Sequence, residues 1–364
     1  MSNLSLSTSP WKRFTTWLTT RPKWVLAIGA VLLVGGAAGA TILVLNSQKK
    51  EEPKTSVTKP APKPKPAPVF YSPLTGEKVS DEAATKQQVT AIMIENSPEA
   101  RPQSGLKQSG VVYEAIAEGG ITRFLTLHQH DKPLLIGPVR SLRMYYIDWL
   151  AAYDASVAHV GGSSAALAEI RNGSYKDIDQ FTNGSSYWRA TDRYAPHNVY
   201  TSFERLDTLN ATKGYTSSTF TSFARTDGKP SETPNATQIT INFSGPLFNT
   251  AYTYDNGSNT YQRSQAGAPH TDREDGQIAP SVVIALKVDM TRIFEDGYRE
   301  SIATTGSGSA VIFQNGTAIE ATWQKPDRRT GITFTDAEGK EIPLVRGQTW
   351  IAAIPNGTGS VSWQ

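Results

Sequence analysis

From residue 71 onward, the pattern of apolar and polar positions divides the chain into two regions. Between residues 71 and 228, short apolar runs alternate with stretches of helical spacing, which is typical of α/β and α+β domains. The runs that predict strands are residues 89–94, 111–117, 122–128 and 155–160. Helices are predicted over residues 143–153, from apolar residues at helical spacing, and over residues 163–171, with Ser163 as the cap.

After residues 227–234 ("DGKPSETP"), the pattern changes to short β-type runs separated by turn residues. Asp255-Asn256-Gly257 and Asn315-Gly316 stand between alternating runs, and such sequences favour hairpins. Residues 229–364 are therefore predicted to form a mostly antiparallel, β-rich domain, as a sheet, a sandwich or a small barrel. The expected fold class is an α/β or α+β N-terminal domain, residues 71–228, followed by this β-rich C-terminal domain.

The N-terminal part of the chain has a different pattern. Residues 24–45 ("WVLAIGAVLLVGGAAGATILVL") are 22 residues without a charge, and a helix needs about 20 apolar residues to cross a bilayer. We predict one transmembrane anchor, retained because cleaved signal peptides usually have shorter apolar cores. Basic residues within residues 1–23 favour a cytoplasmic N-terminus and place the later domains outside the cytoplasm. The expected product is a single-pass protein of the cytoplasmic membrane.

Residues 46–70 link this segment to the folded part and are rich in proline and lysine. Such a segment cannot bury a core, so we expect an extended linker that rises about 3 Å per residue. A plain stalk is one interpretation. The alternative is a basic arm held against anionic lipid or wall polymer.

Composition excludes several classes of function. Charged residues make up 19% of the chain and the net charge is +3, so no nucleic acid is expected as a partner. The chain contains no cysteine, which excludes disulfides, thiolate catalysis, zinc sites of the cysteine type and a lipid-modified N-terminal cysteine. The usual motifs for nucleotide binding, zinc proteolysis and calcium binding are also missing.

Four arginines near predicted turns and strand ends are candidates for ligand binding: Arg101, Arg123, Arg140 and Arg143. A guanidinium suits bidentate contact with phosphate or carboxylate. Arg140 and Arg143 stand at the predicted start of a helix, where the helix dipole disfavours cations. Either an anionic ligand or internal acids such as Glu114 and Glu118 must offset their charge, and the pattern leaves both alternatives open.

The candidate catalytic residues are two glutamates and two histidines. Glu114 and Glu118 are four residues apart, which puts them on one side of either a strand or a helix. His159 precedes a Gly-Gly turn, and His197 lies in the turn-like "RYAPHNVY". An arginine-tied sheet edge is the alternative role for the glutamates. No metal site or cofactor is identified, and a divalent metal is left open.

Six segments occur in an order that is characteristic of one family: "MIENSPEARPQSGL", "VVYEAIAEGGITRF", "IGPVRSLRMYYID", "YDASVAHVGGS", "RYAPHNVYTS" and "HTD". The chain resembles the YerB-like lipoprotein family (DUF3048), a bacterial family of unknown function with an N-terminal and a C-terminal domain. The resemblance implies a location outside the cytoplasmic membrane. His270 and Asp272, in "HTD", are further ligand-binding candidates. Family members are typically anchored through a cysteine, so the predicted span would replace that anchor here.

The order of features also resembles the layout of LytR-CpsA-Psr glycopolymer transferases, which hold a polyprenyl pyrophosphate with arginines and acids. The match is one of layout, since "GPVRSLR" lacks the acid that follows the arginine in that family. Two hypotheses result. One is an envelope binding module for a wall glycopolymer, another anion or an envelope protein. The other is an envelope enzyme that acts on glycan linked to polyprenyl pyrophosphate, or on peptidoglycan.

Overall fold

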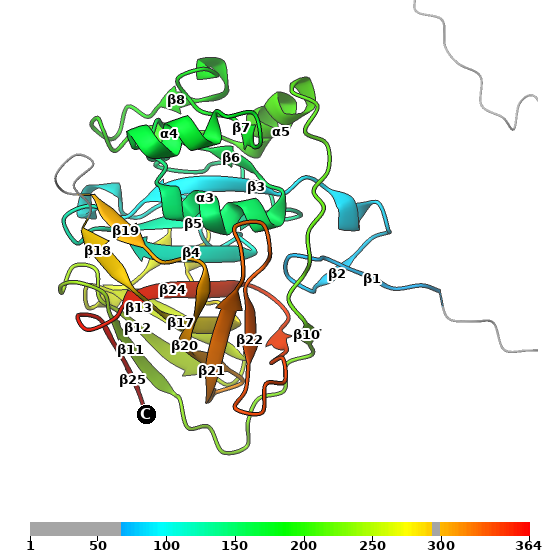
Figure 1. The fold of residues 1–364 in the computed structure, drawn as a ribbon, viewed down its shortest axis with the longest axis vertical. Helices are drawn as coiled ribbons and strands as arrows, with labels where there is room; N and C mark the ends of the chain where they lie inside the picture. The colour runs from blue at the N-terminus through cyan, green and yellow to red at the C-terminus, as the bar shows by residue number, and fades with distance from the viewer. Residues whose placement is uncertain (1–66, 293–298) are drawn as a thin grey trace, which may run out of the picture. The chain divides into compact units, whose positions relative to one another are not determined.

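A ten-stranded mixed sheet contains strands from both regions of the sequence (Figure 1). The structure, a computed structural model, describes residues 67–292 and 299–364. In spatial order, the strands are β22 (Thr333–Thr335), β21 (Thr317–Lys325), β20 (Gly306–Gln314), β17 (Val282–Val288), β24 (Thr349–Pro355), β4 (Val111–Ile116), β5 (Thr122–His128), β3 (Thr90–Glu95), β6 (Ser156–Ala158) and β7 (Lys176–Asp177). The four strands predicted in the first region correspond to β3, β4, β5 and β6.

Parallel pairing of β24 with β4 joins the two regions within this sheet. Thr349 pairs with Val111 and Ala352 with Glu114, and β17 also pairs with β24 in parallel. The C-terminal region therefore does more than form an antiparallel domain of its own, because β17 and β24 extend the sheet of the N-terminal region. Turn signals are local and could not reveal a pairing between strands that lie far apart in the sequence.

The expected domain boundary between residues 228 and 229 lies between β10 (Arg225–Thr226) and β11 (Gln238–Asn242). Residues 67–364 nevertheless form one compact unit. The shared sheet is the physical reason, since cutting the chain at this boundary would divide one hydrogen-bonded sheet into two parts with exposed edges.

A second sheet has five strands and is antiparallel throughout. Its strands, in spatial order, are β14 (Ala268–Pro269), β13 (Thr260–Gln265), β12 (Thr250–Asp255), β11 and β25 (Ser360–Trp363). The turn predicted at residues 255–257 joins β12 to β13, and the turn at Asn315-Gly316 joins β20 to β21. Both hairpin predictions are confirmed.

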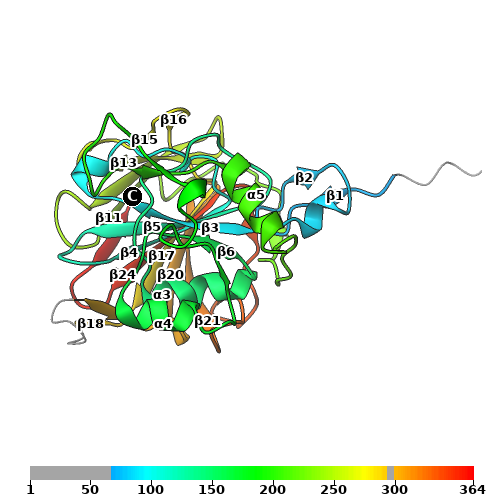
Figure 2. The same cartoon turned by 90° about the horizontal axis from the view of Figure 1, so that it is seen from above.

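The large sheet is covered on both faces. Figure 2 shows α3 (Met144–Leu150) and α4 (Ser164–Ile170) on one face, and the five-stranded sheet with α5 (Phe203–Thr212) on the other. The alternation of side chains along β3 supplies both cores. Ala91 and Met93 belong to the core that includes residues of α3 and α4, whereas Ile92 and Ile94 belong to the core with α5 and β11. Burial of both faces explains the continuous apolar run of this strand.

The helix predicted over residues 143–153 consists of α3 followed by a 3-10 turn, Ala151–Tyr153. Its apolar face packs on the sheet, where the ring of Trp149 stacks on that of Tyr113 at a centroid distance of 5.0 Å. The helix predicted over residues 163–171 is α4. Its cap is confirmed, because Ser163 Oγ accepts a hydrogen bond from the Ala166 amide at 3.3 Å.

Short pairs of strands complete the described fold: β1 (Phe70–Tyr71) with β2 (Lys78–Val79), β8 (Trp188–Arg189) with β9 (Val199–Tyr200), β15 (Thr271–Asp272) with β16 (Gly276–Gln277), β18 (Met290–Arg292) with β19 (Glu300–Ile302), and β10 with β23 (Leu344–Val345). Within the described ranges, no helix has the length and apolar character needed to cross a bilayer. The anchor predicted at residues 24–45, the N-terminus 1–23 and residues 46–66 of the linker lie outside those ranges.

Candidate functional site

Six strands of the large sheet, β7, β6, β3, β4, β24 and β17, run in the same direction. β3, β6 and β7 pair in parallel, as do β17, β24 and β4, and β5 is antiparallel to both β3 and β4. Their carboxyl ends therefore meet along one edge of the sheet. Glu118 follows β4 and His159 follows β6 at this edge, which is where open α/β sheets bind their ligands.

Residues 137–142, within "GPVRSLR", lie between the carboxyl ends of β3 and β6. The Arg140 amide donates to the Met93 carbonyl at 2.8 Å, and the Arg140 carbonyl accepts from the Val160 amide at 3.1 Å. The Glu95 amide donates to the Pro138 carbonyl at 2.9 Å. The two strands thus separate at this edge and hold the arginine-bearing segment between them.

Glu118 pairs with two of the candidate arginines. Arg143, the residue before α3, contacts Glu118 Oε1 through its Nε, and Arg123 Nη2 lies 3.2 Å from Oε2. Burial opposes ionisation of Glu118, but the hydrogen bond from Arg143 and the charges of both arginines outweigh it and lower the pKa of Glu118 below its usual value. Arg123 and Arg143 therefore share one internal carboxylate as their counter-charge.

A second cluster at this edge consists of Glu95, Ser97, Arg140 and His197. Arg140 Nε lies 3.3 Å from Glu95 Oε1, and His197 Nδ1 lies 3.0 Å from the same oxygen. Ser97 Oγ is 3.2 Å from both Glu95 Oε1 and His197 Nδ1. The side chain of Glu95 is 5% exposed, whereas those of Arg140 and His197 are 28% and 24% exposed. A buried acid thus holds a cation and an imidazole at the surface.

This second cluster keeps hydrogen-bonding capacity for a ligand. Within residues 67–292 and 299–364, the two Nη atoms of Arg140 make no hydrogen bond with the protein. When the His197 imidazole carries a proton on Nδ1, that nitrogen faces Glu95 and Nε2 is an acceptor. The arrangement can bind an anion through Arg140 and accept a proton through His197.

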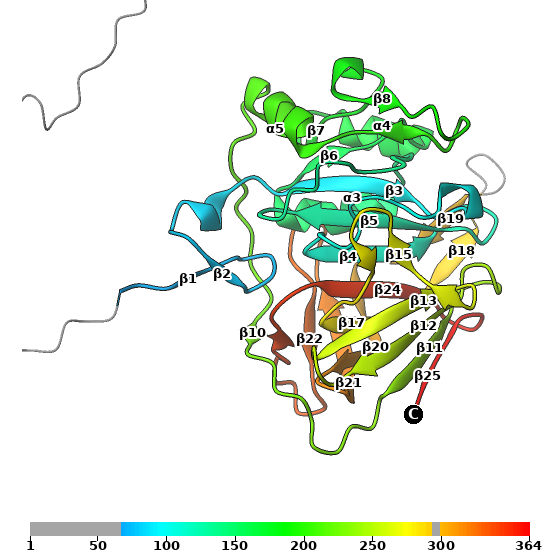
Figure 3. The ribbon, with the colours of Figure 1, turned by 180° about the vertical axis from the view of Figure 1, so that it is seen from behind.

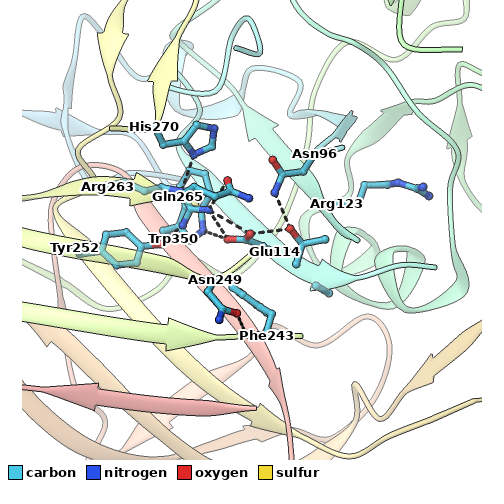
Figure 4. A network of polar contacts seen from close by, with 12 residues as sticks. Asn96, Glu114, Arg123, Phe243, Asn249, Tyr252, Arg263, Gln265, His270 and Trp350 are labelled. Carbon is cyan, nitrogen blue, oxygen red and sulfur yellow. Dashed lines mark hydrogen bonds and ion pairs between the residues drawn. The ribbon is translucent and has the colours of Figure 1, made fainter. Parts of the chain in front are cut away.

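Figure 4 shows a network of polar side chains around Glu114 of β4 and Arg263 of β13. Both side chains are fully buried, and Arg263 Nη2 lies 3.0 Å from Glu114 Oε2. Trp350 Nε1 donates to the same oxygen at 2.9 Å, and Thr122 Oγ1 donates to Oε1 at 3.0 Å. The Arg263 guanidinium also lies 4.3 Å from the centroid of the Trp350 ring. This ion pair connects the ten-stranded sheet to the five-stranded sheet.

The network extends to two further candidates, His270 and Arg101. Arg263 Nε donates to His270 Nδ1 at 2.8 Å, and His270 Nε2 lies 3.0 Å from Gln103 Oε1. Gln103 and Arg101 both donate to Asn96 Oδ1. Burial and the positive charge of Arg263 lower the pKa of His270 well below its usual range. His270 is therefore a neutral imidazole inside the fold.

The remaining candidates, His159 and Asp272, are also enclosed. His159 is fully buried, with Nε2 3.0 Å from Asp177 Oδ1. Asp272 is 2% exposed and accepts a hydrogen bond from the Lys107 amide at 3.1 Å. In the part of the chain that the structure describes, no group of three or more His, Asp or Glu side chains is arranged to hold a metal ion.

The structure thus divides the candidates into separate sets. Glu118, Arg123 and Arg143 share one cluster, Arg140 and His197 share another, and Glu114, Arg101 and His270 belong to the buried network. Glu114, His159 and His270 have protein groups as partners and are at most 4% exposed. A direct catalytic or binding role for these three stays a prediction, and it is one that their burial disfavours.

Sequence reasoning missed Glu95 and Ser97, and also Arg263. Glu95 ends the buried strand "TAIMIE", so an acid at the carboxyl end of a buried strand was an available signal. Arg263 lies in a strand of ordinary alternation. Its burial depends on packing against β4, which no local pattern reveals.

Comparison with known proteins places the chain in a family. Residues 74–216 match the family described as "Protein of unknown function (DUF3048) N-terminal domain", and residues 239–351 match the corresponding C-terminal domain. The chain belongs to the DUF3048 family. A relative, "Putative lipoprotein YerB" of Bacillus subtilis (strain 168), is 33% identical over 290 residues, which cover 78% of this chain and 86% of the relative.

A crystal structure of YerB protein from Bacillus subtilis has a similar fold. It matches with a TM-score of 0.72 at 31% identity and covers 80% of this chain and 99% of that chain. The resemblance to the YerB-like family is therefore confirmed, as is a strand-rich fold with few helices. For DUF3048 the family description gives no activity, so the function must be argued from the site.

Proposed function

We propose that this protein is a membrane-anchored, extracytoplasmic module that binds an anionic group of an envelope polymer at Arg140 and His197. One observation carries the proposal: Arg140 Nε lies 3.3 Å from the buried Glu95 carboxylate at the carboxyl edge of the sheet, and the Arg140 side chain is 28% exposed. A guanidinium that is already positioned binds phosphate or carboxylate with little further loss of side-chain freedom. Arg123 and Arg143, by contrast, both contact the Glu118 carboxylate and are 6% and 9% exposed.

The membrane anchor in this proposal is the apolar segment at residues 24–45, since the chain has no cysteine for lipid attachment. The description of the Bacillus relative as a lipoprotein supports attachment to a membrane with the folded part outside the cytoplasm. The linker rich in proline and lysine would separate the folded part from the bilayer.

Two exposed aromatic side chains favour a polymer over a small free anion. Tyr194 is 91% exposed, and its carbonyl accepts a hydrogen bond from the His197 amide at 2.9 Å. Phe181 is 72% exposed, and its ring lies against Gly161, which is hydrogen-bonded to Leu142. Exposed apolar surface beside a polar centre is typical of binding sites, and flat aromatic rings suit the faces of sugars.

The test measures the thermal stability of residues 67–364 with increasing pyrophosphate, citrate or purified anionic wall polymer. This part forms one compact unit, and the crystallised relative corresponds to 80% of the chain, so it is expected to fold alone. A ligand at 100 times its Kd stabilises a protein by about 2.7 kcal/mol. Wild type should therefore show a clear rise in Tm with at least one of these anions.

Arg140→Gln should lose most of that rise, because no other exposed guanidinium is held at this position. Lys340→Gln is the matched control, since it removes an exposed positive charge elsewhere on the molecule and should respond like wild type. The binding proposal is wrong if Arg140→Gln and wild type are stabilised equally by every anion.

The contacts of His197 favour a second candidate, an envelope enzyme that acts on glycan linked to polyprenyl pyrophosphate, or on peptidoglycan. With Nδ1 facing Glu95 at 3.0 Å, Nε2 can take a proton from water or a hydroxyl while Arg140 binds the phosphate. A carboxylate that orients an imidazole in this way is the usual arrangement of a general base.

His197→Gln separates the two candidates. For a binding module, neither wild type nor variant should release product from lipid-linked glycan or peptidoglycan, and anion-dependent stabilisation should be clear in wild type and weaker in the variant. For an enzyme, wild type should release product, and the variant should be slower by about 100-fold or more, the usual contribution of a general base. A variant as active as wild type would exclude His197 as the base.

A further inference from the structure

Strand β25, at the end of this chain, is the outer strand of the five-stranded sheet (Figure 3). It pairs with β11 on one side, from Ser360 opposite Asn242 to Trp363 opposite Ile239. Within the described residues, no strand pairs with its other side. An outer strand of this kind presents backbone groups to which another chain can hydrogen-bond.

The register identifies which backbone groups face outward. Gln238 and Gln364 exchange both backbone hydrogen bonds, and such pairs alternate with non-hydrogen-bonded pairs along an antiparallel ladder. The backbone N–H and C=O groups of Val361 and Trp363 therefore point away from β11. No residue in the ranges 67–292 and 299–364 bonds to these groups.

A groove of about 620 Å³ follows the same edge. Strand β25 forms one wall, and the hairpin of β20 and β21 forms the other. The lining includes Lys287, Val311, Glu320, Asp336, Val361 and Trp363. A volume of this size is within the range that holds ligands in proteins. Because β25 lines the groove, its unpaired backbone groups and a space for a partner's side chains lie along the same edge.

The sequence of β25 lacks the features that usually protect an outer strand. It reads Ser-Val-Ser-Trp, without the lysine or proline that commonly prevents pairing, and no bulge interrupts its register with β11. The Trp363 ring packs on Phe313 at a centroid distance of 5.5 Å and is 37% exposed. It therefore offers apolar surface to an added strand.

The charged side chains of the groove favour a basic occupant. The Lys287 ammonium donates to the Gly359 carbonyl at 2.9 Å. Glu320 is exposed, and Asp336 uses Oδ1 to accept from two backbone amides of its own turn. Two carboxylates and one ammonium thus line the groove, which leaves an excess of negative charge. Complementary charge would come from lysine or arginine.

We propose that an extended segment of a partner protein, with basic residues at alternate positions, adds to β25 as a further strand. Its backbone hydrogen-bonds with Val361 and Trp363, and its basic side chains contact Glu320 and Asp336. A second copy of this chain fits less well, because its own Glu320 and Asp336 would enter an already acidic groove. The inference does not depend on the function proposed for Arg140.

The experiment uses residues 67–364 and a fluorescein-labelled peptide, Thr-Lys-Val-Lys-Val-Lys-Thr, with fluorescence polarisation as the readout. Wild type should bind the peptide saturably and at least 10-fold more tightly than the same peptide with glutamate in place of lysine. Val361→Pro removes one outward N–H that the ladder with β11 does not use, so binding should weaken at least 10-fold. Val361→Thr keeps the N–H and should bind like wild type.

Charge reversal tests the second half of the proposal. In the double variant Glu320→Lys with Asp336→Lys, the preference should reverse, so that the glutamate peptide binds at least 10-fold more tightly than the lysine peptide. Circular dichroism and thermal unfolding of each variant show that the fold is kept. Arg140→Gln should bind the lysine peptide like wild type, which keeps this test distinct from that of the anion site.

Three results would overturn the inference. Equal binding of the lysine and glutamate peptides would show that the acidic lining does not select the partner. Unchanged binding by a folded Val361→Pro would show that the peptide does not add as a strand. A dimer of wild type that is lost in Val361→Pro, seen by sedimentation, would identify a second copy of this chain as the occupant.

Discussion

Breaking the buried ion pair between Glu114 and Arg263 should destabilise the fold more than the loss of any exposed ion pair. Arg263→Met removes the cation and leaves the Glu114 carboxylate with the Trp350 indole and the Thr122 hydroxyl as its donors. Glu114→Gln removes the anion and leaves the Arg263 guanidinium without a charged partner. Each single variant therefore leaves one uncompensated charge where both side chains are fully buried.

The size of the effect follows from the distance and the burial. At an effective dielectric of 20, two unit charges 3.0 Å apart attract each other by about 5.5 kcal/mol. Desolvation of both charges opposes this attraction, and removal of one partner from a buried pair typically costs about 3–5 kcal/mol. Since an ordinary domain is stable by about 5–15 kcal/mol, each single variant should lose a large part of its stability.

The assay is urea unfolding of residues 67–364, followed by tryptophan fluorescence. Trp350 should report directly because its indole N–H donates to Glu114. The double variant, with Glu114→Gln and Arg263→Met together, buries no charge and should lose at least 2 kcal/mol less than the sum of the single losses, in line with the interaction energies of residues in contact. Lys132→Met is the control, because its pair with Asp207 is partly exposed and should contribute less than about 1 kcal/mol.

Two results would refute this reasoning. The first is a loss of unfolding free energy below about 1 kcal/mol for each single variant, because a buried charge without a partner should destabilise the fold by more than this. The second is strict additivity in the double variant, which would mean that Glu114 and Arg263 do not stabilise each other.

Three smaller changes test other parts of the fold. Burial lowers the pKa of His128 from its usual 6.5 to about 4, so between these pH values the unfolded chain binds a proton that the folded protein does not. Wild type should lose up to about 3 kcal/mol more unfolding free energy than His128→Gln as the pH falls through this window, and parallel pH curves would contradict this. Ser163→Ala should lose about 1 kcal/mol because it removes the cap of α4, whereas the exposed Ser174→Ala should be neutral in the same urea assay. Gly316→Ala adds a Cβ 2.6 Å from the Tyr254 ring at a φ of +77°, whereas the Cβ of Gly173→Ala, at a similar φ, meets nothing within 4 Å. Gly316→Ala should therefore lose about 1–3 kcal/mol more stability than Gly173→Ala in thermal unfolding. Equal losses would mean that the Tyr254 ring moves aside freely.

Several elements could be predicted because their signals are local. The strand β5 covers the apolar run at residues 122–128, and the hairpin turns at Asp255-Asn256-Gly257 and Asn315-Gly316 lie where their sequences indicate. Ser163 caps α4 because a serine before a helical pattern can accept from the first turn wherever that helix packs. Each of these features depends on neighbouring residues and not on distant ones.

The candidate site was predicted only in part. His197 and Arg140 were singled out by residue type and context, yet their common partner, Glu95, was not. Glu114 looked like a catalytic acid, but its side chain points toward β13, where it meets Arg263. Whether an acid faces solvent or another strand depends on which strands pack together, and that is not encoded in the spacing of nearby residues.

The sequence by itself determined the local elements, the family and the presence of two arginines in the segment before α3, although only Arg143 directly precedes the helix and Arg140 lies between β3 and β6. Tertiary structure decided how the charges of those arginines are offset. Arg143 pairs with Glu118 and its side chain is 9% exposed, while Arg140 pairs with Glu95 and its side chain is 28% exposed. The physical reason is that helical and strand periodicity arise from the backbone geometry of adjacent residues, whereas the neutralisation of a charge depends on distances across the sheet.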